Sequence, residues 1–375
     1  MIKIPKRNEL YFTGSDLRNR ILCVGEHEHK IYMPNEIFSE LINGFTNDKG
    51  ELVQGFLDED GKKIKEFTSS THIAYAYSYV YLAHYMYRYC KYYYDGAKDI
   101  DEKMIKQILG FPAKSDSYTY ITKKGGLLER LGYIRKESDK PIRPILEETS
   151  PELSEFLMES NYSELFGDNR RNRKINFPVK AFHREAWAEE DNYFNGTFFN
   201  VLNTHKIDIE IFIYCMTDPE LGVKGFYLYC FMLYNNDKFN NGFNCSFEKL
   251  ASLTGLSIKT IRTQLENLEK RNMILNDHKP FCINKKDWQI TKPNTYKTLA
   301  FEQFISNKLE YNEIPKQRKI NAERYAKEIG FVNQEEVEEQ SYKKKSMKKS
   351  NNYLNNYSYN TSIYDKNGVS IPLPF

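Results

Sequence analysis

The sequence has no apolar run that approaches the roughly 18 residues needed to cross a lipid bilayer. Residues 1–7 also lack the apolar stretch of a secretory signal. We therefore expect a cytoplasmic protein that has no contact with membranes.

Paired cysteines and the common nucleotide-binding motifs are absent as well. The six cysteines are scattered and none forms the C-x-x-C pair that structural zinc sites usually contain. No phosphate-binding G-x-x-x-x-G-K-[ST] pattern occurs, and no serine or cysteine nucleophile can be identified. We therefore predict reduced thiols, no metal, no other cofactor and no enzymatic activity.

The chain also lacks an excess of charge of one sign. Its 54 Lys and Arg residues nearly balance its 51 Asp and Glu residues, so the formal net charge is only +3. The overall charge therefore gives no indication of a polyanionic partner. Whether the chain binds one has to be judged from the local distribution of charge.

Glycine and proline are missing from residues 71–94. An apolar stripe with spacings of three and four, typical of one helix face, runs through this segment. The stripe consists of Ile73, Ala76, Val80, Ala83, Tyr87 and Cys90. Four tyrosines alternate instead, as in a strand, but so long a strand would far exceed the usual five or six residues. We predict a helix.

The order of residues from 246 onward is that of two helices joined by a tight turn. Ser246 can cap a short helix with one apolar face. That face consists of Phe247, Leu250 and Ala251. Gly255 stands where a helix end needs a left-handed backbone, which glycine adopts without a Cβ clash. With a preceding helix at 225–235, this pattern predicts a helix-turn-helix.

The second of these helices has one apolar and one polar face. Ser257 can cap it. The inward positions, at spacings of three and four, are Ile258, Ile261, Leu265 and Leu268. The outward positions are Lys259, Thr260, Arg262, Thr263 and Asn267. A polar, cationic face fits a DNA groove better than a hydrophobic partner, although helix-turn-helix units also serve as protein contacts.

The segment after this helix is typical of a wing. Residues 273–275 and 281–283 are short strand candidates around a turn at 276–280, and 288–290 or 296–299 could add a further strand. Residues 257–297 contain nine basic and four acidic residues, a net charge of +5 that exceeds that of the whole chain. Such a local excess is what contact with phosphates requires. We predict that Ser257, the five outward residues, Lys279, Lys285, Lys286 and Lys292 contact double-stranded DNA.

A second copy of the pattern lies 140 residues upstream. Residues 128–134 align with 268–274, and 104–110 occupy the place of 250–255. Ser115 would cap the second helix of this copy. Its residues predicted near DNA are Ser115, Tyr118, Thr119, Lys123 and Lys124. Gly125 and Gly126 would lie inside that helix, where each costs roughly 1 kcal/mol.

These patterns predict an α+β, mainly α fold with two winged helix-turn-helix domains, a β-containing N-terminal segment and a disordered C-terminal tail. The predicted regions are a β-rich segment at 1–66, a first winged-helix-like domain at 67–140, a linker at 141–180, a second winged-helix domain with flanking helices at 181–331, and the tail at 332–375. The linker would contain a short helix capped by Ser150 and a basic cluster at 170–174. The polar tail cannot bury enough apolar surface to offset its ordering entropy.

Two winged helices followed by a low-complexity tail resemble the replication initiators of plasmids and phages, and phage replisome organisers. Residues 292–297, Lys-Pro-Asn-Thr-Tyr-Lys, are similar to a motif of winged-helix replication proteins from Gram-positive phages and plasmids. The resemblance covers about 225–299 well and 71–134 loosely. It implies recognition of a replication origin and recruitment of a helicase or helicase loader.

Other interpretations remain open. A transcriptional regulator could use the same units on operator DNA. A rolling-circle nickase would need a metal held by two histidines, for which His27-Glu28-His29 is the nearest match, although an exposed strand edge explains it better. The C-terminal peptide 371–375 could dock on a sliding clamp or another replication partner. The protein could be a monomer or a dimer.

Overall fold

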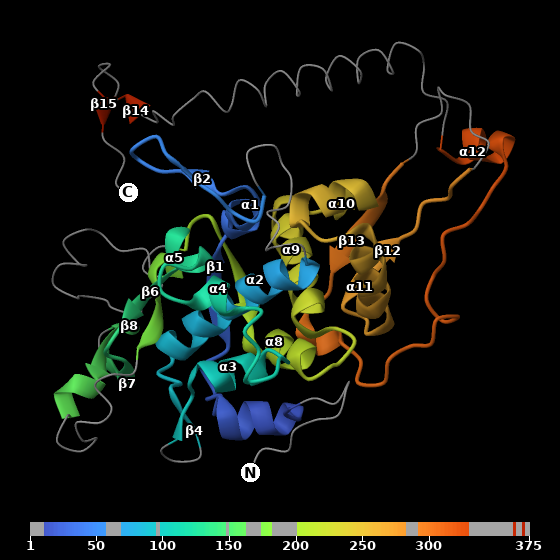
Figure 1. Cartoon of the computed structure of the whole chain (residues 1–375). Helices are drawn as coiled ribbons and strands as arrows, with labels where there is room; N and C mark the ends of the chain where they lie inside the picture. The colour runs from blue at the N-terminus through green and yellow to red at the C-terminus, as the bar shows by residue number, and fades with distance from the viewer. Residues whose placement is uncertain are drawn as a thin grey trace. The chain divides into compact units, whose positions relative to one another are not determined.

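Figure 1 shows the computed structural model of the chain. The structure describes residues 11–57, 69–94, 98–147, 150–162, 174–181, 201–282, 292–329, 363–364 and 370–371. Two compact units are formed, one by Met1–Asp277 with Thr295–Ile314 and the other by His278–Asn294 with Pro315–Phe375. The described chain is a mixed α/β structure with small antiparallel sheets.

The first half of the larger unit is made of short elements around one long helix. Its helices are α1 (Ile37–Asn43), α2 (Ser70–Arg88), α3 (Glu102–Ile108), α4 (Thr119–Thr122) and α5 (Leu127–Arg130), with a π-helical segment at Asp16–Ile21 and 3-10 turns at Glu159–Tyr162 and Val179–Ala181. Its strands are β1 (Lys30–Pro34), β2 (Phe45–Thr46), β3 (Leu52–Val53), β4 (Tyr93–Tyr94), β5 (Lys98–Asp99), β6 (Ile134–Glu137), β7 (Pro141–Glu147), β8 (Ser150–Met158) and β9 (Ile175–Pro178).

The second half of this unit contains the elements that follow β9. Its helices are α8 (Ile209–Met216), α9 (Gly222–Lys238), α10 (Phe247–Thr254) and α11 (Ile258–Lys270), with a 3-10 turn at Phe301–Gln303. Its strands are β10 (Thr204–Asp208), β11 (Phe243–Cys245), β12 (Ile274–Asp277) and β13 (Asn294–Thr298). The smaller unit contains α12 (Ala322–Ile329), β14 (Ile363–Tyr364) and β15 (Ser370–Ile371).

Helix α2 is the centre of the larger unit. The predicted helix is confirmed, although it ends at Arg88 and the following tyrosines form β4. The alternating tyrosines and the apolar stripe are buried, except for Cys90, which follows the helix and is half-buried. On one side Tyr77 and Tyr81 contact rings of α9 and α8, and on another Tyr75 stacks on Tyr118 at 4.5 Å between ring centroids. A helix that is apolar all round is a buried helix.

The N-terminal segment is paired with the second half of the unit. Strand β1 lies antiparallel to β10, from Lys30 opposite Asp208 to Pro34 opposite Thr204. The segment expected to be β-rich therefore supplies a strand, but its described part also contains α1 and the π-helical segment. Together with the packing of α2 on α9, this pairing joins the two halves into one compact unit.

The expected linker has regular structure. The short helix predicted to start after Ser150 is wrong, because Ser150–Met158 forms strand β8, which pairs antiparallel with β7 (Pro141–Glu147). Strand β9 pairs with β6, from Ile134 opposite Pro178 to Glu137 opposite Ile175. Of the basic cluster at 170–174, only Lys174 lies within the described residues. Most of the tail lies outside them too, apart from the small β14–β15 hairpin.

The two halves share part of one order of elements. A long helix is followed by shorter helices and then by two paired strands: α2, α3, α4 with α5, β6 and β9 in the first half, and α9, α10, α11, β12 and β13 in the second. The first half also contains the β4–β5 pair and the β7–β8 pair, whereas β11 of the second half pairs with β13.

The residues aligned from the sequence have matching geometry. Gly132 and Asn272 have positive φ angles of 73° and 52°. Each is followed by a buried residue whose amide donates a hydrogen bond to the carbonyl oxygen five residues earlier. These bonds run from Tyr133 to Leu128 at 2.8 Å and from Met273 to Leu268 at 3.0 Å.

The second helix of the first copy differs from its prediction. It is broken into α4 and α5 around Gly125 and Gly126. Gly125 has a φ of +70°, and a Cβ on Gly126 would lie 2.5 Å from the carbonyl oxygen of Tyr120. Ser115 does not cap α4, whose N-cap position is Tyr118. The glycines therefore end one helix and allow a second to begin.

Helices capable of spanning a membrane are not found in the part of the chain that the structure describes.

Candidate nucleic-acid interface

Helix α10 begins and ends as its sequence predicts. The Ser246 side chain accepts a hydrogen bond from the amide of Lys249 at 3.2 Å, which satisfies one of the amides left open at a helix start. At the other end Gly255 adopts a φ of +66°, and its amide donates to the carbonyl of Ala251. The turn between the two helices is thus fixed by a glycine in the left-handed region.

Gly255 has a second, packing role. A Cβ added at this position would lie 2.5 Å from Cδ1 of Ile73 in α2. On the other side of the turn, the amide of Ser257 donates to Oγ of Ser70, also in α2, at 2.9 Å. The turn is therefore held against the N-terminal end of the central helix.

Helix α11 follows directly and packs against α9 and α10. Ser257 caps it by accepting from the amide of Thr260 at 3.2 Å. Of its four predicted inward residues, Ile261, Leu265 and Leu268 are buried. Ile258 is not, since it is 37% exposed in the first turn. The first residue of the helix is therefore more exposed than its spacing predicts.

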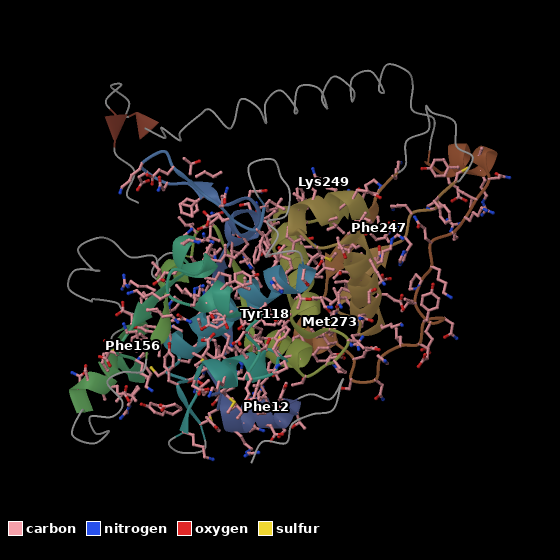
Figure 2. The ribbon with its side chains drawn as sticks, viewed as in Figure 1. Phe12, Tyr118, Phe156, Phe247, Lys249 and Met273 are labelled. Carbon is pink, nitrogen blue, oxygen red and sulfur yellow. The ribbon has the colours of Figure 1, made fainter. Side chains whose placement is uncertain are left out.

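The outward face of α11 is cationic at its start. Lys259, Arg262 and Thr263 are exposed, and Thr260 is half-buried. The Arg262 guanidinium lies over the ring of Phe247 in α10, 5.2 Å from its centroid. This contact holds the arginine stem against the protein while leaving the side chain exposed. In Figure 2, Phe247 and Lys249 are labelled on α10, which packs against α11.

Asn267, predicted to face outward, is buried. Its side-chain amide donates to the carbonyl oxygen of Glu220 at 2.9 Å, as does that of Gln264 at 3.0 Å. Both residues therefore fix α11 to the turn before α9. Contact of Asn267 with DNA is incompatible with this position.

The wing is a three-stranded sheet in the order β11–β13–β12. Strand β12 pairs antiparallel with β13, from Ile274 opposite Thr298 to Asp277 opposite Thr295. The predicted pairing of 273–275 with 281–283 is wrong, because Phe281 forms an isolated bridge with Lys319 instead. Pairing with β13 buries Tyr296 beside Ile274 in the core. A helix-turn-helix followed by such a hairpin has the geometry of a winged helix.

Residues 220–274 match the model of the helix-turn-helix domain family. This range contains α9, α10 and α11, whose geometry is described above. The chain contains a helix-turn-helix DNA-binding domain. No curated protein and no solved structure matches the chain.

The charge of the helix-turn-helix domain is less positive than its composition indicates. Arg271 is buried, and its guanidinium donates to Asp218 at 2.5 and 2.8 Å and to Glu220 at 2.6 Å. Lys270 is paired with Glu266 at 2.6 Å. Both cations were part of the net charge of +5. The charge available to a phosphate backbone is therefore carried by other residues, Lys259 and Arg262 foremost.

The predicted wing lysines are only partly described. Lys285 and Lys286 lie outside the described residues. In the smaller unit, Lys292 is exposed and Lys279 is half-buried, with its amide donating to Oδ1 of Asn294 at 3.0 Å.

In the first half of the chain, the candidate residues separate into two groups. Lys123 and Lys124 are exposed at the end of α4. Tyr118 instead packs against Tyr75 and Phe111, as its position in Figure 2 among the side chains of the larger unit also indicates. Ser115 and Thr119 hold the buried Lys106, whose Nζ donates to Ser115 O at 2.8 Å and to Thr119 Oγ1 at 3.5 Å. Of these five residues, only Lys123 and Lys124 are exposed.

Three exposed residues of the helix-turn-helix domain were missed by the sequence prediction. Lys249 and Ser252 lie on α10, and Lys297 lies on β13 of the wing. The first helix of such a motif crosses the DNA backbone. Position on this helix could therefore have indicated Lys249 and Ser252.

The structure gives no support to a metal site at His27-Glu28-His29. Glu28 accepts from the amide of Gly25 at 2.6 Å and is paired with Lys91 at 2.6 Å. Among the described residues, no group of histidine, cysteine and acidic side chains could hold a metal ion.

Proposed function

We propose that the protein binds double-stranded DNA in a sequence-specific manner through α11, with the wing and α10 contacting the backbone. The observation that carries this proposal is the exposed Lys259 and Arg262 in the first turns of a capped, firmly packed recognition helix. Residues at this place meet base edges in the major groove. Arginine can form two hydrogen bonds with the edge of a guanine.

The test uses a target selected from a random duplex library. Replacing Arg262 by Ala should reduce discrimination between this target and random duplex by roughly 1 to 3 kcal/mol, the value of one good bidentate contact. Arg262→Lys keeps the charge but loses the planar fork, so it should lose discrimination while retaining most affinity for random DNA. The control is Lys49→Ala, which changes an exposed lysine in the turn between β2 and β3. An equal loss on both duplexes for Arg262→Ala would contradict base reading.

We further propose that this binding serves the initiation of replication. Support comes from the Lys-Pro-Asn-Thr-Tyr-Lys segment at 292–297 and from the partly shared order of elements in the two halves of the larger unit. The alternative, a transcriptional regulator, would use the same helix. A plasmid that lacks its own origin and carries the gene with its flanking DNA should replicate in a suitable host. Replication that persists with Arg262→Ala would contradict the proposal.

A further inference from the structure

A cavity of about 390 Å³ lies in the first half of the larger unit, away from the helix-turn-helix domain. It is lined by side chains of α2, α3, β6 and β9, and by Lys174, which directly precedes β9. Ala83, Met86 and Ile175 supply apolar surface. The volume falls within the range of sites that hold small molecules.

The acidic residues that line this cavity are already engaged. Asp99 forms an ion pair with the buried Lys140 at 2.7 Å. Asp101 caps α3 by accepting from the amide of Met104. Glu102 accepts from the hydroxyls of Tyr79 and Thr122, each at 2.7 Å. The cavity therefore does not offer these carboxylates to a cation.

Three lysines line the cavity: Lys103, Lys136 and Lys174. The carboxylates of Glu102 and Glu129 act on Lys136 from a distance, without an ion pair among the described residues. Burial lowers the pKa of Lys136, the carboxylates of Glu102 and Glu129 act in the opposite direction, and the charge of Lys174 lowers it. Lys136 lies opposite Asn176 in the β6–β9 pair, and Lys174 is the residue before β9 begins. Cross-strand partners share one face of a sheet, so the side chains of Lys136 and Asn176 lie on the same face.

Two polar groups on the cavity wall are buried without a hydrogen-bond partner. They are Oδ1 of Asn176, which is 7% exposed as a residue, and the hydroxyl of Tyr92, which is 4% exposed. The orientation of the Asn176 amide is fixed, because its Nδ2 donates to the Tyr79 hydroxyl, which itself donates to Glu102. Its Oδ1 is therefore an acceptor that needs a donor. Leaving such groups unsatisfied costs about 1 to 3 kcal/mol each.

We propose that this cavity binds a small organic phosphate whose organic part carries an N–H or O–H donor, of about the size of a nucleoside monophosphate. The phosphate would lie between Lys136 and Lys174, which relieves their mutual repulsion. The organic part would lie on the apolar wall and donate to Asn176 Oδ1. This site is separate from the proposed DNA-reading helix.

Isothermal titration calorimetry with the full chain tests the proposal with three probes: adenosine 5′-monophosphate, adenosine and inorganic phosphate. The monophosphate should bind, and both fragments should bind more weakly. In the double variant Lys136→Met with Lys174→Met, its dissociation constant should rise by at least roughly tenfold, because two charge-assisted contacts are lost. Tyr92→Phe should weaken binding to a smaller extent. The control is Lys114→Met, an exposed lysine that does not line the cavity.

Affinity for duplex DNA and the melting temperature without ligand show whether the double variant is folded. Failure of the monophosphate to bind, or equal binding by the double variant, overturns the proposal. If the double variant loses DNA affinity while the monophosphate does not bind, the lysines serve the DNA backbone and the proposal is also overturned. Neither outcome bears on the proposed base reading by Arg262, because Arg262 lies on α11 and does not line this cavity.

Discussion

Two arginines of the helix-turn-helix domain have opposite environments although they are nine positions apart. Arg262 is exposed and rests on the ring of Phe247. Arg271 is buried and bound to Asp218 and Glu220. Composition counts both as positive charge, but only Arg262 can meet DNA. Arg271 joins the end of α11 to the turn before α9.

We expect Arg271→Ala to destabilise the protein by about 2 to 3 kcal/mol, somewhat below the usual loss for breaking a buried ion pair because Asp218 and Glu220 are partly exposed. The measurement is urea unfolding, with Arg262→Ala as the matched control that should change the free energy of unfolding little. The fraction that remains folded should discriminate between target and random duplex as the unchanged protein does. A loss of discrimination without a loss of stability would assign Arg271 to DNA contact.

Gly255 combines a left-handed backbone with a close approach to Ile73. Gly50, in the turn before β3, also has a positive φ of 78°, but nothing lies within 4 Å of an added Cβ there. Gly50→Ala should therefore cost about 1 kcal/mol from backbone strain alone. Gly255→Ala should cost roughly 1 to 3 kcal/mol more, because Ile73 must move as well. Chemical unfolding of both variants measures this difference in the free energy of unfolding. Equal losses of stability would show that the Ile73 side chain can move aside without cost.

At this scale, periodicity predicted the cationic face of α11 but not every member of each face. Ile258 was placed inward because it fits the spacing, yet it is 37% exposed. Asn267 was placed outward because it is polar, yet the carbonyl of Glu220 lies beside it. A single sequence does not show where a distant carbonyl oxygen will lie. Tyr118 was misplaced for a related reason, since its partners are in α2 and the loop after α3.

At the scale of elements, capping residues and a glycine predicted the helix-turn-helix correctly, whereas the caps predicted at Ser115 and Ser150 were wrong. Ser246, Gly255 and Ser257 gave the boundaries of α10 and α11, because each acts through its nearest neighbours in the chain. The partner of β12 was not predictable in the same way. Residues 281–283 and 296–299 were both strand candidates, and the second became part of β13 (Asn294–Thr298), in which Tyr296 is buried. Pairing between distant strands depends on the whole core and not on the turn alone.

The junction of β10 with α2 contains a buried histidine. His205 Nδ1 lies 2.9 Å from Asn35 Oδ1, and its Nε2 lies 2.7 Å from the Tyr77 hydroxyl. Burial lowers the pKa of His205 to about 3. The folded protein therefore keeps this ring neutral, whereas the unfolded chain takes up a proton near the ordinary pKa of about 6.5.

Because only the unfolded state takes up this proton, the free energy of unfolding falls as the pH drops from about 6.5 toward 3. The contribution of His205 is at most about 1.4 kcal/mol for each pH unit. Urea unfolding at pH 7 and pH 5 should show this fall, and His205→Gln, which can still hydrogen-bond but does not titrate, should reduce it. If both proteins have the same pH dependence, His205 is not the group responsible.

At the scale of the whole molecule, the two halves of the larger unit are packed together. Helix α2 lies against α9, and β1 pairs with β10. The exposed Lys123 and Lys124 of one half and the recognition helix of the other therefore belong to one compact unit. Two contacts held by one body bind more tightly than either alone, by about 10² to 10⁴-fold where the geometry permits both.

We expect both halves to engage one DNA site, so that a footprint covers two adjacent major grooves on an asymmetric target. Removing the first half would destroy the core, so point variants are the proper test. The double change Lys123→Ala with Lys124→Ala should remove protection on one side of the site only, whereas Arg262→Ala should weaken the other side. The halves differ in sequence, with α4 and α5 broken at the glycines and α11 continuous, so the two parts of the site should differ as well. A symmetric palindromic target, or a footprint that the lysine changes leave intact, would show that the first half does not read DNA.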